Sequence, residues 1–204
     1  MTGGAVLWTL VGLGLLVVVT RRRSIAVALV TAQALVLVAI ALDQATGAAD
    51  VAVAAALVIR AAALAALFLW LALQTRNPRP IRAAARPFVR AGAACSLALT
   101  LTWLVPSIGL SDRNVERAVL ALVAFGLVSV AMRRPTLFQV IGIVLVENGL
   151  ALAALELPGA PSLLIELGVA LDLTLIALVA ALFHFRIFVE FGTGDSAALR
   201  SLRD

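Results

Sequence analysis

A few ionisable side chains lie inside long apolar runs of this sequence, where a charge is costly and can therefore carry chemistry. Arg60 and Glu147 each come about ten residues into such a run and Asp172 about nine, so at about 1.5 Å per helical residue all three would lie near the middle of a bilayer. An ionisable group at that depth costs about 3 kcal/mol or more unless it is paired, faces protein or lines water. Arg60 therefore needs an acidic partner, and both Glu147 and Asp172 have a compatible depth.

The buried carboxyl groups are candidates for proton transfer, because a carboxyl group held inside a membrane can take up or release a proton near neutral pH. We expect this role for Glu147, together with Asp172 or with Glu166, which lies about one turn inside the last apolar run. His184, the single histidine, lies near the end of that run and suits a proton gate, because histidine titrates near neutral pH. Arg60 keeps its proton and would act as the charge partner. The alternatives are that Arg60 and its acid form a static pair that joins helices, that Glu166 faces the headgroups, and that His184 is an interfacial bystander.

The elements that must position these groups are predicted to be transmembrane helices. The chain has 204 residues, of which 63% are hydrophobic and 13% charged, and its mean hydropathy is +1.12. A soluble domain is typically about half apolar and a quarter charged. The apolar runs are continuous rather than alternating, which favours helices over barrel strands. We predict an all-α integral membrane bundle of about seven transmembrane helices, at 4–19, 24–42, 50–74, 91–110, 115–132, 137–157 and 163–188.

The connections between these spans differ in charge, and this difference predicts the topology. All sixteen basic residues are arginines, and the connections that follow the second and sixth spans hold none of them. The connection that follows the fourth span is balanced, with Asp112 and Glu116 against Arg113 and Arg117. The positive-inside rule then places the N-terminus outside and the C-terminus in the cytoplasm, with the basic connections resting on anionic lipid headgroups. We divide the chain into front transmembrane helices (1–132) with an Arg-rich cytoplasmic loop (75–90), a back part (133–190) that carries the buried carboxylates and works with span 115–132, and a cytoplasmic tail (191–204).

The sequence contains no recognisable catalytic or cofactor-binding motif. A single histidine and a single cysteine, Cys95, cannot supply paired haem ligands, an iron–sulfur cluster or a zinc cage. We expect Cys95 to be a small buried residue. The formal net charge of +5 does not indicate nucleic acid as a partner, because the arginines lie in loops between apolar runs. We therefore expect no metal and no cofactor bound by this chain, and leave open whether it belongs to an enzyme complex.

The back half of the chain resembles a known family. The segments "GIVLVENGLALAAL" (142–155), "PSLLIELGVALDLTL" (161–175) and "FRIF" (185–188) resemble the hydrogenase-4 component E family, which comprises membrane subunits of formate-hydrogenlyase-type and related group 4 [NiFe]-hydrogenase complexes. The last three spans also look like the NuoK-type subunit of respiratory complex I and the related MrpC-type antiporter subunit. That three-helix subunit has one membrane-embedded Glu in its second helix and one in its third. Glu147 matches the first by position, whereas Asp172 has the better depth for the second and Glu166 stands in the "ELG" segment.

This resemblance implies a role that the residues alone do not name. The chain would be a non-catalytic membrane subunit of a complex I-like or group 4 hydrogenase-type respiratory complex in the bacterial cytoplasmic (inner) membrane. Its buried carboxylates would contribute to proton or Na⁺ translocation. The [NiFe] or iron–sulfur centres would lie in a soluble cytoplasmic arm, and the membrane partners would be antiporter-like subunits and a membrane-anchor subunit. The alternatives are a purely structural spacer or assembly subunit, an MrpC-like cation/proton antiporter subunit, and an independent transporter of a small solute.

Overall fold

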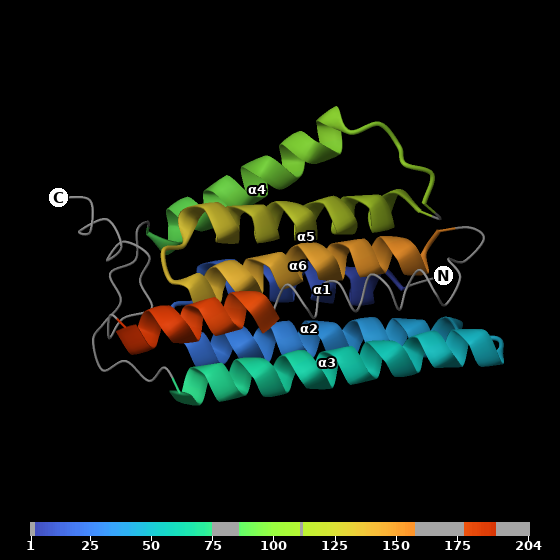
Figure 1. Cartoon of the computed structure of the whole chain (residues 1–204). Helices are drawn as coiled ribbons and strands as arrows, with labels where there is room; N and C mark the ends of the chain where they lie inside the picture. Colours follow the sequence, from blue (N-terminus) through green and yellow to red (C-terminus); the bar gives the residue numbers. More distant parts are fainter. Residues whose placement is uncertain (1–2, 75–85, 111, 158–177, 191–204) are drawn as a thin grey trace.

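The computed structural model describes residues 3–74, 86–110, 112–157 and 178–190, and each element in this part of the chain is an α-helix (Figure 1). Five of the helices, α2 to α6, are long and apolar enough to cross a membrane, and α1 is a shorter apolar helix. The prediction of an all-helical membrane protein is confirmed to this extent, while the number of crossings and the side of each terminus stay predictions. The helices are α1 (Gly4–Val19), α2 (Arg23–Gln44), α3 (Ala48–Gln74), α4 (Pro87–Leu104), α5 (Arg113–Met132), α6 (Thr136–Leu155) and a further helix at 178–190.

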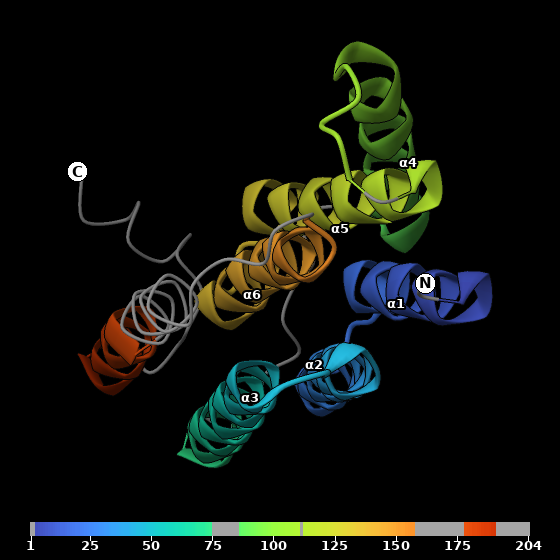
Figure 2. The ribbon, with the colours of Figure 1, turned by 90° about the vertical axis from the view of Figure 1, so that its right-hand side faces the viewer.

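The labelled helices lie side by side along one direction, with α4 inclined to the others (Figures 1 and 2). α5 packs on α6 and α4, and α2 packs on α3. α1 and α6 join these two groups, because α1 contacts both α5 and α2 and α6 also contacts α2. α3 and α4 therefore lie at opposite edges, and the interior is built mainly from α1, α2, α5 and α6.

The helix α4 begins and ends earlier than the predicted span 91–110. Pro87 stands in its first turn, where the missing N–H costs no helical hydrogen bond. The helix ends at Leu104 because Val105 precedes Pro106, whose ring disfavours a helical conformation in the residue before it. Arg90, which we assigned to the preceding connection, consequently lies on the helix.

The remaining predicted spans begin and end within a few residues of the observed helices. The exception is the predicted last span, 163–188, of which only 178–188 belongs to the described residues. The loop predicted at 75–90 likewise lies mostly outside them.

Two glycines bring the backbones of α5 and α6 together. A Cβ atom at Gly126 would lie 2.5 Å from the carbonyl oxygen of Gly142, and one at Gly142 would lie 2.8 Å from the carbonyl oxygen of Gly126. Small residues at such a crossing allow membrane helices to approach closely. This contact fixes α6 against α5 about one and a half turns before Glu147 and Asn148, and so helps to set the direction in which these two side chains face.

The prediction that Cys95 is buried is wrong, because its side chain is exposed. α4 packs on α5 and α1 along one side only, where Arg90 and Ala94 are its buried residues. Cys95 follows Ala94 and is turned about 100° around the helix, so it lies at the edge of this contact and stays exposed.

Candidate functional site: a buried polar chain

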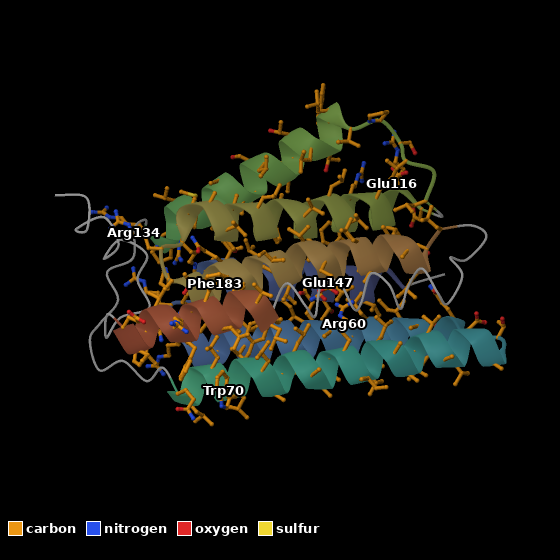
Figure 3. All side chains as sticks on the ribbon, viewed as in Figure 1. Arg60, Trp70, Glu116, Arg134, Glu147 and Phe183 are labelled. Carbon is orange, nitrogen blue, oxygen red and sulfur yellow. The ribbon has the colours of Figure 1, made fainter. Side chains whose placement is uncertain are left out.

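Arg60 and Glu147 form an ion pair in the interior of the bundle (Figure 3). Arg60 Nη1 lies 2.8 Å from Glu147 Oε1, and the two side chains are 6% and 2% exposed. Both residues lie in the middle part of their helices, α3 and α6. α3 packs mainly on α2, so the long arginine side chain is what reaches α6. The structure thus brings Arg60 to one of the two acids that the sequence left open.

Arg60 is also held by amide side chains that lead across the bundle to α1. Its Nη2 donates a 2.9 Å hydrogen bond to Asn148 Oδ1. Asn148 Nδ2 in turn donates a 2.9 Å bond to Gln33 Oε1, and Gln33 Nε2 donates a 3.0 Å bond to the carbonyl oxygen of Leu10. Asn148 and Gln33 are completely buried. We call the Leu10 carbonyl, Gln33, Asn148, Arg60 and Glu147 the polar chain, and its members come from α1, α2, α6 and α3.

The two ends of the polar chain fix the orientation of both amides. The Leu10 carbonyl can only accept, so Gln33 must turn its NH₂ group to α1 and its oxygen to Asn148. The Arg60 guanidinium can only donate, so Asn148 must turn its oxygen to Arg60 and its NH₂ group to Gln33. Asn148 therefore holds Arg60 in place in either charge state of Glu147.

The carboxylate of Glu147 has unused acceptor capacity. Its Oε1 lies at ion-pair distance from Arg60, but among the described residues neither oxygen accepts a hydrogen bond of good geometry. An ionised carboxylate offers about four acceptor positions. Glu147 can therefore take up a proton, or accept a bond from a water or a partner's side chain, while the Arg60 charge stays in position.

His184 lies apart from the polar chain. It is fully buried on helix 178–190, and its Nδ1 contacts the hydroxyl of Thr136 in the first turn of α6. Its Nε2 has no hydrogen-bond partner among the described residues. The ring centroids of Trp70 on α3 and Phe185 on helix 178–190 lie 5.4 Å apart, and this contact joins the two helices. Since Thr136 and Glu147 are about 16 Å apart along α6, the proposed gate and the proposed carboxylate do not touch.

The other two predicted acids, Asp172 and Glu166, lie outside the described residues. The choice between them as the second carboxylate stays open. Within the described ranges, no group of three or more His, Cys, Asp or Glu side chains is placed to hold a metal ion.

Two arginines that we interpreted as topology signals also serve as buried helix caps. The carbonyls at the end of α1 have no partners within the helix and carry the negative end of its dipole. Burial, and to a lesser degree the Arg90 charge, lowers the pKa of Arg133 to about 9, so it stays cationic at neutral pH. Arg133 Nη2 donates to the carbonyl oxygens of Val17, Val18 and Thr20 at 3.0, 2.7 and 2.6 Å, and Arg90 Nη2 donates to that of Val19 at 3.2 Å.

Sequence reasoning missed Gln33 as a member of the site. The available signal was an amide side chain in the middle of an otherwise apolar span. Polar side chains at such positions commonly bond to other helices in a membrane. Asn148 directly follows Glu147 in the sequence, but we assigned it no role and did not anticipate its bonds to two other helices.

Comparison with known proteins gives one similarity and no assignment of function. No family model matches the chain, and no solved structure matches it. The chain is 32% identical over 91 residues to the uncharacterized protein Rv0085 of Mycobacterium tuberculosis, an alignment that covers 45% of this chain and 41% of that protein. The chain thus spans about two fifths of the length of this relative.

Proposed function

We propose that this chain is a non-catalytic membrane subunit of a complex I-like or group 4 [NiFe]-hydrogenase-type complex, in which Glu147 exchanges protons in response to redox chemistry in a partner arm. The observation that carries the proposal is the Glu147 carboxylate. It is buried, faces a fixed cation, and has no well-aligned hydrogen bond from the described residues. It lies in the segment 142–155, which is part of the resemblance to hydrogenase-4 component E.

The separate anchoring of Arg60 supports a carboxylate that changes its charge. When Glu147 takes up a proton, Arg60 loses an ionic partner but keeps its bond to Asn148. The guanidinium can then stabilise the ionised form again when the proton leaves, without a large rearrangement. A second acid would balance the Arg60 charge in the protonated state, and Asp172 and Glu166 are the candidates on this chain.

The proposal includes seven crossings, an outer N-terminus and a cytoplasmic C-terminus in a bacterial inner membrane. Two sets of contacts support this topology. Arg133 and Arg90 both bind the end of α1, so the basic connections gather at one end of the bundle. Gln44 donates a 2.7 Å hydrogen bond to Glu156, which joins the two connections without arginine at the other end. The positive-inside rule assigns the basic end to the cytoplasm.

The proposed partners follow from the resemblance. Antiporter-like membrane subunits and a membrane-anchor subunit would lie beside the bundle, and a soluble arm with [NiFe] or iron–sulfur centres would dock on the cytoplasmic side. This chain would bind none of those centres. Its contribution would be the buried carboxylate and its fixed counter-charge.

Co-purification tests the proposed complex. The tagged chain is extracted from membranes in a mild detergent, and the proteins that accompany it are identified by mass spectrometry. We expect antiporter-like membrane proteins together with a nickel–iron or iron–sulfur subunit. Recovery of the chain alone as a monodisperse species would contradict the proposal and favour an independent transporter.

A purely structural spacer is the competing proposal, and the polar chain itself favours it. Interhelical bonds such as those of Gln33 and Asn148 fix the packing of membrane helices without any transport. The two proposals differ when Glu147 is replaced in an assembled complex. If the chain is a spacer, the replacement either prevents assembly of the complex or has no effect. If Glu147 carries protons, the complex still assembles but loses the coupling between redox chemistry and proton movement.

A further inference from the structure

A groove of about 490 Å³ lies between α1, α4 and α5, on the side of the bundle away from α3. It arises because α4 inclines away from α5 toward its C-terminal end (Figures 1 and 2). The volume is within the range of about 300–1,000 Å³ that is typical of small-molecule sites. The groove shares no residue with the polar chain.

The lining of the groove changes from polar to apolar along its length. Asn114 and Arg117 line it in the first turns of α5, beside Trp103 in the last turn of α4, whereas Cys95 and Phe125 line the opposite end. From Asn114 to Phe125 the groove follows α5 for about 16 Å. This length is close to half of the ~30 Å hydrocarbon core, which is the depth that one acyl chain of a single leaflet fills.

The polar end has the features of a membrane interface. Trp8 and Trp103 are 64% and 92% exposed there, and tryptophan prefers the headgroup level. Arg117 is exposed, and no ion pair to it is present among the described residues, whereas Arg113 lies 3.9 Å from Glu116. The mouth of the groove therefore presents a positive charge at the depth of lipid phosphates.

We propose that this groove binds a phospholipid of net negative charge, with one acyl chain between α4 and α5 and the phosphate on Arg117. A zwitterionic lipid fills the same apolar wall, but its own cation offsets the attraction to Arg117. A transmembrane helix of a partner would bury Arg117 without a counter-charge unless it also supplied an acid. An anionic lipid meets both requirements of the groove at once.

Photocrosslinking in membranes that contain the full chain and its natural partners tests this site. The probes are phosphatidylglycerol and phosphatidylcholine, each with a diazirine near the end of one acyl chain. Because the diazirine lies at the far end of the acyl chain from the phosphate, we expect phosphatidylglycerol to label the apolar end of the groove, 95–99 and 121–125, more strongly than other lipid-facing segments. Arg117→Gln is expected to lower this labelling about fivefold, the factor that one arginine contributes near an anionic surface. Arg117→Lys keeps the charge and is expected to retain the labelling.

The matched control is Arg186→Gln, which removes an arginine with an 82% exposed side chain from helix 178–190 and is expected to leave the labelling unchanged. Labelling spread evenly over all lipid-facing helices, equal labelling by the two lipids, or no effect of Arg117→Gln would overturn the proposal. So would labelling of the groove in the isolated chain but not in the assembled complex, since a partner helix would then occupy it.

Discussion

Arg60→Met is expected to destabilise the bundle strongly, mainly because it leaves Glu147 buried without its cation. The two charges are 2.8 Å apart and the Glu147 side chain is 2% exposed. Removing one partner of a buried ion pair costs about 3–5 kcal/mol. The change also takes the donor from Asn148 Oδ1, and an interhelical hydrogen bond in a membrane contributes about 0.6 kcal/mol on average. We therefore expect a loss of about 4 kcal/mol in the free energy of unfolding.

Glu147→Gln is expected to lower the free energy of unfolding by only about 1.5 kcal/mol. Arg60 keeps its hydrogen bond to Asn148 in this variant and can donate another to the new amide oxygen. The double variant Arg60→Met/Glu147→Gln buries no charge at this site. Its expected loss is about 2 kcal/mol, which is smaller than that of Arg60→Met alone. The two changes should thus be coupled by about 3.5 kcal/mol.

Reversible unfolding in mixed micelles of a mild detergent and dodecyl sulfate measures these free energies, with tryptophan fluorescence and helical circular dichroism as probes. The control cycle uses Arg186→Met and Glu190→Gln, a surface pair whose N–O distance is 3.8 Å and whose side chains are 82% and 57% exposed. Its coupling should stay below about 1 kcal/mol. If the Arg60 and Glu147 changes added within about 0.5 kcal/mol, the reasoning about the buried pair would be refuted.

Three further changes test the rest of the structure by the same unfolding measurement. Asn148→Leu breaks two interhelical hydrogen bonds and is expected to lower the free energy of unfolding by about 1–3 kcal/mol. An unchanged free energy of unfolding would contradict the role of the polar chain. Gly126→Ala places a Cβ 2.5 Å from a backbone oxygen of α6 and is expected to lower the free energy of unfolding by about 1–3 kcal/mol. The control is Gly12→Ala, which should leave this free energy unchanged because no neighbour lies within 4 Å of the added Cβ. Arg133→Gln removes the cap of α1 and is expected to lower the free energy of unfolding by about 1–3 kcal/mol and to speed hydrogen exchange at the end of α1. Arg186→Gln, which removes an 82% exposed arginine, should do neither, and equal effects of the two changes would contradict the capping role.

The helices could be predicted because each apolar run is continuous and is separated from the next by charges, prolines or polar residues. Hydropathy reports how far a residue lies along a span, but not the rotation of the helix or its neighbours. Arg60 and Glu147 were therefore recognised as a possible pair by depth, while the choice between Glu147 and Asp172 needed the packing of α3, α2 and α6. Cys95 shows the same limit, because a single apolar helix has no sequence mark for the side that faces outward.

The polar chain and the caps of α1 were harder to predict for another reason. Gln33 carries no charge, so a search for costly charges in the membrane passes over it. Arg90 and Arg133 stand beside span ends, where arginines commonly act as topology signals. Their guanidinium groups reach the carbonyl oxygens at the end of α1 because α4 and the α5–α6 connection both lie at that end of the bundle. This arrangement depends on the packing of the helices, which the sequence does not show.

The central claim is that Glu147 carries protons in a redox-driven complex, and the ratio of protons moved to electrons transferred tests it most directly. Inverted membrane vesicles that contain the assembled complex are supplied with its electron donor, and acidification of the interior is followed together with electron transfer. For Glu147→Gln we expect intact assembly, continuing electron transfer and a lowered proton-to-electron ratio, while Glu190→Gln leaves the ratio unchanged. An unchanged ratio in the assembled Glu147→Gln complex would contradict the claim and leave the structural spacer as the better account.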